Sequence, residues 1–218
     1  MSIIQLKKRP LKRDETRLRD DRLFIVACDD TYAPKQYFEF FEIPRVHIHV
    51  IPSEEGENSA GHVLEHLLAC ERGDDDELWL LLDTDHYASG RHVKNFISAI
   101  KRARRHGVQV ALSKPCFELW LLLHHVDETE VAELADASEV GRKIRQVLGE
   151  YNKKSLKPGH FPLELVPSAF KRAARLDVSI GGGEIPAGNN SRVYLLWQSI
   201  IDKAHPLQLP DVLAGLKS

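Results

Sequence analysis

Carboxylates follow two apolar runs in this chain, and their types and spacing suit a specific chemistry. Asp29 and Asp30 come directly after the run at 22–28, and Asp83 and Asp85 follow a second run. On an extended backbone Asp83 and Asp85 point the same way, because residues two apart share a face. Two oxygen-rich side chains directed at one point suit a hard cation such as Mg²⁺ or Mn²⁺. The alternative is structural, since Asp-Thr-Asp also opens loops and caps helices.

The two runs predict buried strands, and the chain around them alternates strands with helices. This alternation predicts an α/β fold with a mainly parallel sheet flanked by helices. Ligands bind outside the carboxyl ends of the strands in such sheets, so the four aspartates meet at one edge if their strands are neighbours. The predicted strands are 22–28, 46–51, 78–82 and 108–112, and the predicted helices between them are 32–41, 62–69 and 93–100.

The composition and the apolar pattern of the chain change twice along its length, which predicts three regions. Residues 1–20 are rich in Lys and Arg and predict a basic arm, 21–126 form the α/β core, and 127–218 form a helical C-terminal region packed on that core. The segment 117–125 predicts a helix on the sheet with Glu118 near its start. Glu118 there either interacts with the helix dipole or belongs to the site. The predicted C-terminal helices are 140–148, 169–176 and 193–201, and 181–190 predicts a flexible loop.

Composition narrows the class of protein. The formal net charge is −2, so the whole molecule has no positive field that would attract a polyanion. Basic residues nevertheless gather in the arm and at 91–106. No apolar run approaches the ~20 residues of a membrane span, and the N-terminus lacks the apolar core of a signal peptide. These features predict a cytoplasmic protein without a membrane partner. Three cysteines (Cys28, Cys70 and Cys116) give no disulfide framework and predict buried thiols.

Together, several short motifs resemble the RloB family, a Toprim-related group associated with bacterial restriction and phage-defence loci. The resemblance covers about residues 20–200, and 113–125 (SKPCFELWLLLHH) is its most specific part. The motifs that carry it are Cys28-Asp29-Asp30, Tyr37-Phe38, Asp83-Thr84-Asp85-His86 and 113–124, and more weakly Tyr151 with Lys153 or Lys154, and Asn190 before Val193.

The resemblance implies a Toprim-like core with an acidic, Mg²⁺-dependent site. The paired carboxylates of that site correspond to Asp83 and Asp85. The first acidic residue departs from the family pattern, because Asp29 stands where the family has Glu and Asp30 stands where it has Gly. Ala33-Pro34 stand where the family has Thr-Glu. Asp is one methylene shorter than Glu, so a contact tuned for Glu could be lost.

Metal-assisted cleavage of nucleic-acid phosphodiesters is the leading hypothesis, with an effector role in anti-phage defence. Asp29, Asp83 and Asp85 are the expected metal ligands and catalytic residues, and Glu118 and His86 are further candidate catalytic residues. His124 is a further candidate to donate a proton or to orient a carboxylate. The expected phosphate or nucleic-acid contacts are Arg91, Lys114 and Lys154.

Two alternatives stay open. The first is a non-catalytic Toprim-like sensor or partner subunit that binds a nucleic acid, a nucleotide or a companion ATPase, and the missing family Glu favours it. The second is a small-molecule phosphatase, because the same acidic edge serves other phosphoryl transfers. The sequence does not distinguish an RNA substrate from a DNA substrate.

Overall fold

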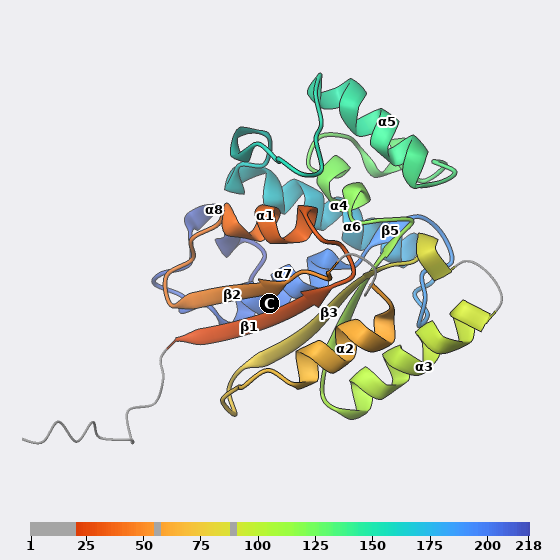
Figure 1. Cartoon of the computed structure of the whole chain (residues 1–218). Coiled ribbons are helices and arrows are strands. Elements are labelled where there is room, and N and C mark those ends of the chain that lie inside the picture. The colour runs from red at the N-terminus through yellow and green to blue at the C-terminus, as the bar shows by residue number, and fades with distance from the viewer. Residues whose placement is uncertain (1–20, 55–57, 88–90) are drawn as a thin grey trace, which may run out of the picture.

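A computed structural model describes residues 21–54, 58–87 and 91–218, and the predicted basic arm at 1–20 lies outside this part. Within the described residues the chain forms an α/β fold around one mostly parallel sheet, as predicted (Figure 1). The strand order is β2-β1-β3-β4-β5. The strands are β1 (Arg22–Cys28), β2 (Val46–Ile51), β3 (Glu77–Asp83), β4 (Gln109–Lys114) and β5 (Asn190–Ser191).

The register of the sheet places β1 and β3, the two strands that lead into the aspartates, side by side. β1 pairs in parallel with β2 and with β3, and β3 pairs in parallel with β4. Cys28 lies opposite Leu81, so both carboxyl ends reach the same edge. The four predicted strands and the neighbouring positions of β1 and β3 are therefore confirmed.

The strand β5 was not predicted. Asn190 lies in the segment predicted as a loop, yet with Ser191 it pairs antiparallel with the end of β4. The hydroxyls of Ser113 and Ser191 lie 2.8 Å apart, and the Arg192 backbone N–H donates to the Leu112 carbonyl at 2.8 Å. The C-terminal region therefore completes the sheet beside the strand ends that carry the aspartates.

Alternate residues of the central strand enter two separate hydrophobic cores. Trp79 and Leu81 of β3 pack into one core, and Leu78, Leu80 and Leu82 pack into the other. Side chains alternate between the faces of a strand, and an uninterrupted apolar run is needed where both faces are covered. Helices α2 (Ala60–Leu68) and α3 (Arg91–Arg105) cover one face, while α1 (Ala33–Glu39), α4 (Glu118–Leu122) and the C-terminal helices cover the opposite face (Figure 1).

The helices agree with the apolar periodicity, although their ends shift by a few residues. Ser59 accepts a hydrogen bond from the His62 backbone N–H at 3.4 Å and caps α2. Gly107 follows α3 with a φ of 74°, a value that glycine adopts without strain. The α-helices are α1 (Ala33–Glu39), α2 (Ala60–Leu68), α3 (Arg91–Arg105), α4 (Glu118–Leu122), α5 (Ala137–Leu148), α6 (Val166–Ser179), α7 (Val193–Lys203) and α8 (Asp211–Ala214).

The C-terminal helices share a core with the sheet. Trp197 and Ile200 of α7 are fully buried in the same cluster as Phe24 of β1 and Leu81 of β3. Burying large side chains across the two regions removes apolar surface from water, which is the main stabilising contribution to folding. Helix α7 therefore packs on the same core as the sheet.

A buried ion pair anchors this region next to β5. The Arg192 guanidinium donates to the Asp177 carboxylate from Nε at 3.1 Å and from Nη2 at 3.0 Å. A third bond runs from Arg192 Nη1 to the Glu184 carbonyl at 3.2 Å, and the Tyr194 hydroxyl donates to Asp177. The pair thereby ties α6 and the 181–190 segment to the residue that follows β5.

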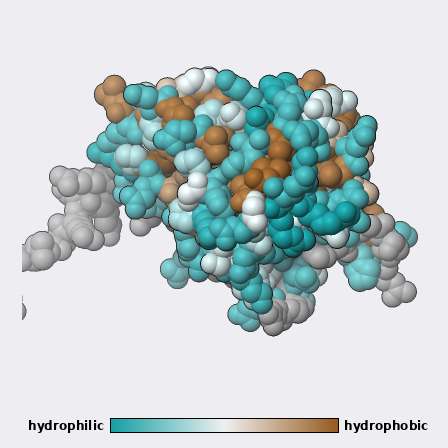
Figure 2. Space-filling view, turned by 90° about the horizontal axis from the view of Figure 1, so that it is seen from above, coloured by the Kyte–Doolittle hydropathy of each residue, from teal (hydrophilic) through white to brown (hydrophobic). Residues whose placement is uncertain are grey.

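The surface viewed from above in Figure 2 is mostly hydrophilic, with apolar residues in several small groups. None of the helices in the described part of the chain combines the length and apolar composition that crossing a bilayer requires. Cys28 and Cys116 are buried and Cys70 is half-buried, and all three are free thiols.

Candidate metal centre

Three carboxylates from separate elements converge at the carboxyl edge of the sheet. Asp30 follows β1, Asp83 ends β3 and Glu118 begins α4. One oxygen from each lies within 4.8 Å of the others. The exposed fractions are only 7%, 4% and 7%, so these oxygens face one another rather than solvent. Three carboxylate oxygens around one small space form a donor set for a hard divalent cation.

Asp30 is oriented by the start of the first helix. Its Oδ1 accepts hydrogen bonds from the backbone N–H groups of Tyr32 and Ala33, at 2.7 Å and 3.1 Å. This Asx turn satisfies amides that the beginning of α1 would leave without partners. Oδ2 of Asp30 is thereby left pointing toward the carboxylates of Asp83 and Glu118.

Asp29, which the sequence predicts as a metal ligand, contacts the backbone at the end of β3. Its Oδ2 and Oδ1 both accept from the Asp83 backbone N–H, at 3.1 Å and 3.3 Å. The side chain thus links the ends of β1 and β3 and holds Asp83 in place. Within the described residues, the group of side chains able to hold a metal contains Asp30 rather than Asp29.

The expectation that Asp83 and Asp85 share an extended backbone is wrong, because the strand stops at Asp83. Thr84 forms a bend, and Asp85 begins a short 3₁₀ helix, η1 (Asp85–Tyr87). The Thr84 and Asp85 backbone N–H groups both donate to the Pro115 carbonyl at 3.1 Å. These bonds join the end of β3 to the turn before α4 and thereby bring Glu118 close to Asp83.

The C-terminal region supplies a cation to this cluster. The Nζ of Lys153 lies 2.5 Å from Asp30 Oδ2 and 3.3 Å from Glu118 Oε1. The Tyr151 hydroxyl donates to the same Glu118 oxygen at 3.1 Å. Burial acts to lower the pKa of Lys153, but Glu118 and Asp30 outweigh it and hold the pKa above its ordinary value.

Gln36 of α1 fixes the backbone that presents Lys153. Its amide nitrogen donates to the Lys153 carbonyl at 3.0 Å, and its amide oxygen accepts from the Leu156 backbone N–H at 2.9 Å. The 151–156 segment is thus attached to the helix that begins at the acidic edge.

Two of the aspartates at this edge, Asp29 and Asp83, are destabilised in their ionised form. Burial raises the pKa of Asp83, and the charges of Asp29 and Glu118 raise it further. Burial also raises the pKa of Asp29, partly offset by the bond from the Asp83 N–H. Several buried carboxylates near one another favour a bound cation, because each isolated negative charge is costly to remove from water.

A cavity of about 270 Å³ opens onto this edge. It is lined by Asp29, Asp30, Thr31, Tyr32, Asn58, Asp83, Lys153 and Lys154. The Lys154 ammonium lies 5.0 Å from the centre of the Tyr32 ring, so a cation and an aromatic face lie together in the wall. This cavity gives a ligand access to the carboxylates.

The other expected phosphate contacts are placed differently. Lys114 donates to the carbonyls of Ala187 and Pro186, at 2.8 Å and 3.3 Å, and so engages the 181–190 segment. The side chains of Arg91 and His86 lie outside the described part of the structure.

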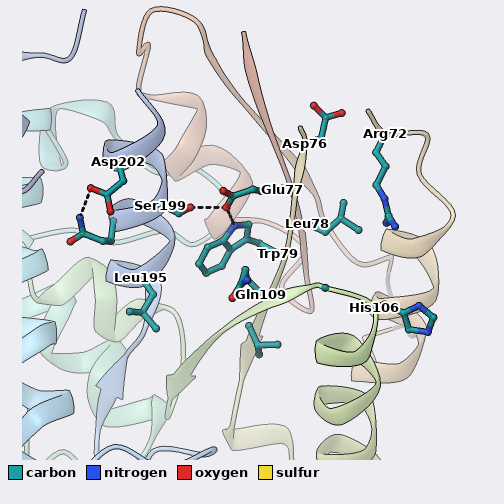
Figure 3. Close-up of a pocket in the computed structure, with 13 residues that line it drawn as sticks. Arg72, Asp76, Glu77, Leu78, Trp79, His106, Gln109, Leu195, Ser199 and Asp202 are labelled. Atoms are coloured by element: carbon teal, nitrogen blue, oxygen red, sulfur yellow. Dashed lines mark hydrogen bonds between the residues drawn. The ribbon is translucent and has the colours of Figure 1, made fainter. Parts of the chain in front are cut away.

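A larger cavity, of about 580 Å³, lies at the opposite edge of the sheet, where β3 begins (Figure 3). One of its three acidic residues, Glu77, accepts hydrogen bonds from the Trp79 indole at 3.0 Å and the Ser199 hydroxyl at 2.6 Å. The carboxylate is thus occupied in joining β3 to α7. The smaller cavity at the carboxyl edge is the better candidate site, because two of the three converging carboxylates, Asp30 and Asp83, line it.

Comparison with known families gives one match. A family model described as RloB-like protein matches residues 24–200, a range that includes most of β1, all of β2 to β4, the carboxylates and Lys153. The chain belongs to the RloB-like family. Neither the curated proteins nor the solved structures yield a match.

Sequence reasoning identified part of this RloB-like site. It named Asp83 and Glu118 as site residues and noted that Asp30 reaches the same edge. Lys153 entered only through the weak Tyr151-Lys153 motif, and no role was assigned to it. The ion pairs could not be inferred, because Lys153 and Glu118 are distant in sequence and meet through the packing of the C-terminal region.

His124 of the RloB-like chain is part of the core. It is 2% exposed, and its Nδ1 lies 2.9 Å from the Trp120 carbonyl, which can only accept. Nδ1 therefore carries the proton, and Nε2 accepts from the Tyr37 hydroxyl at 3.0 Å. Both ring nitrogens are engaged in holding α4 against α1, and burial lowers the pKa of His124 to about 3.

The lowered pKa of His124 predicts that the folded protein is less stable at acidic pH. Between the ordinary value of 6.5 and about 3, the unfolded chain binds a proton that folded His124 does not. Stability therefore falls as the pH drops through this window, by about 1.4 kcal/mol per pH unit from this group. Urea unfolding at several pH values measures the slope. His124→Gln is expected to flatten the curve, and an unchanged slope would exclude His124 as its source.

Proposed function

We propose that this RloB-like protein is a divalent-metal-dependent nuclease that hydrolyses nucleic-acid phosphodiesters. The observation that carries the proposal is the convergence of Asp30, Asp83 and Glu118, with oxygens within 4.8 Å, at the carboxyl edge of a parallel sheet. That edge is where α/β proteins bind ligands.

The residues present fit Mg²⁺ or Mn²⁺. The donors are carboxylate oxygens, which hard cations prefer, and they are buried together with the charges of Asp29 and Asp85 nearby. Asp30, Asp83 and Glu118 would hold the ion. Once bound, it would polarise a phosphoryl oxygen and offset the negative charge that develops there.

Other side chains support substrate binding. Asp29 keeps the Asp83 backbone in position through the bond to its N–H. Lys154 and Tyr32 form a cationic and aromatic part of the cavity wall, a combination suited to a phosphate next to a base. The proposed substrate is therefore RNA or DNA, and the proposed setting is anti-phage defence in the cytoplasm.

A second candidate is a sensor or partner subunit that binds a nucleic acid, a nucleotide or a companion ATPase without cleaving anything. The Lys153 ammonium favours it, because this cation already offsets Asp30 and Glu118. A site whose negative charge is partly offset by its own lysine could serve as a binding surface.

Cleavage assays separate the two candidates. Purified protein is expected to degrade single-stranded RNA or DNA with Mg²⁺ or Mn²⁺ and to stop when the metal is chelated. Glu118→Gln is expected to lower the rate by roughly 10- to 100-fold, because it removes one charged ligand and keeps the side-chain shape. Glu133→Gln, an exposed control on the same chain, is expected to leave the rate unchanged.

Two results would count against the nuclease. If no nucleic acid is degraded with either metal although the metal binds, the sensor is favoured. If degradation occurs and survives Glu118→Gln unaltered, the activity belongs to a different site.

A further inference from the structure

The position of Lys153 relative to the carboxylates has a consequence for metal binding. Its Nζ contacts two of the three residues of the candidate metal centre, Asp30 at 2.5 Å and Glu118 at 3.3 Å. A divalent ion needs oxygens of the same residues at roughly 2.0–2.6 Å. The ammonium and the metal ion therefore compete for the carboxylates of Asp30 and Glu118.

Charge makes the two cations exclude each other as well. An ammonium only a few ångströms from a divalent ion is repelled strongly in a partly buried site, where water screens little. Without a metal ion, however, the ammonium offsets Asp30 and Glu118, which are each 7% exposed. The site thus suits one cation at a time.

The structure also provides a route for the ammonium to leave. The Lys153 side chain is 42% exposed, so it can turn toward solvent without disturbing the core. Its backbone carbonyl is held by Gln36, so the side chain moves while the 151–156 segment stays in place. Lys154 next to it already lies over the Tyr32 ring in the cavity wall.

We propose that Lys153 is an intramolecular counter-ion of the metal centre, which a divalent ion must displace from Asp30 and Glu118 in order to bind. The displaced ammonium then lies at the cavity opening beside Lys154, where a phosphate enters. Metal binding thereby replaces one positive charge at the carboxylates with two and adds a free ammonium at the cavity opening, and both changes favour the approach of a polyanion. This inference rests on the metal site of the proposed function.

Metal affinity tests the displacement without any measurement of activity. Calorimetric titration with Mn²⁺ is expected to show Lys153→Met binding at least about tenfold more tightly than wild type, because no ammonium has to be displaced. Lys154→Met is the matched control, since it removes the same charge from the same cavity wall but contacts neither carboxylate. Its affinity is expected to stay within about twofold of wild type. Equal or weaker binding by Lys153→Met, or an equal gain in Lys154→Met, would overturn the proposal.

A second measurement uses the wild-type protein, so it holds if Lys153→Met fails to fold. Acetic anhydride labels free lysine amines, and mass spectrometry locates the label. Lys153 is expected to be protected without metal and labelled several-fold faster in saturating Mg²⁺, whereas Lys157, paired with Glu150, is expected not to change. Continued protection of Lys153 when calorimetry shows bound Mg²⁺ would overturn the displacement.

The outcomes also distinguish a failure of the Lys153 displacement from a failure of the proposed nuclease function. If neither wild type nor Lys153→Met binds Mn²⁺, the metal site and the displacement both fail. If Mn²⁺ binds and Lys153 is released but no nucleic acid is cut, the displacement stands and the nuclease fails.

Discussion

Asp83→Asn is expected to lower metal-dependent cleavage by roughly a hundred- to a thousandfold, because it removes a charged oxygen ligand from the centre of the site. The same change is expected to keep or raise the melting temperature. Burial, Asp29 and Glu118 raise the pKa of Asp83, so its ionised form is disfavoured in the folded protein, and a neutral amide relieves this repulsion. Loss of activity together with retained stability distinguishes a functional carboxylate from a structural one.

Asp74→Asn provides the matched control. It makes the same chemical change at an exposed position before β3 and is expected to alter neither the rate nor the melting temperature. Cleavage rates and thermal unfolding of the three proteins give the comparison. Full activity in Asp83→Asn would contradict the assignment, and loss of both folding and activity would make Asp83 a structural residue.

Arg192→Met is expected to destabilise the fold by about 3 kcal/mol, since it leaves the Asp177 carboxylate largely buried without its cation. The pair has side-chain exposures of 9% and 14%, and the guanidinium also donates to the Glu184 carbonyl. The effect is expected to reach the site, because Ser191 next to it contacts Ser113 at the end of β4. Urea unfolding measures the loss.

A double variant tests the cause of that loss. Adding Asp177→Leu to Arg192→Met removes the uncompensated charge and is expected to recover more than half of the stability. If the double variant is as unstable as the sum of both single variants, the ion pair is not the interaction that holds β5 in place.

The sheet could be predicted from the sequence because its central strands are buried on both faces. Such strands need uninterrupted apolar runs, and the run at 78–82 ends in a carboxylate at the edge where ligands bind. β5 could not be predicted in this way. It has two residues, and its position depends on Arg192, Asp177 and the Ser113–Ser191 contact, none of which produces a local pattern.

The site could be predicted in part for a similar reason. Strand ends bring Asp29 and Asp83 to one edge, and this followed from the order of the elements. Which carboxylate faces the cluster depends on backbone detail beyond the strands. Asp29 turns toward the Asp83 N–H, while the Asx turn at the start of α1 directs Asp30 inward. Lys153 depends on long-range packing and on the bond from Gln36, so its role became apparent only from the structure.

Anomalous diffraction from crystals soaked in Mn²⁺ tests the central claim most directly. The proposed site predicts a peak coordinated by oxygens of Asp30, Asp83 and Glu118, with the Lys153 ammonium withdrawn from Asp30. A crystal saturated with Mn²⁺ that shows no ion among these carboxylates, or shows it at a site built without Asp83, would contradict the proposed metal centre.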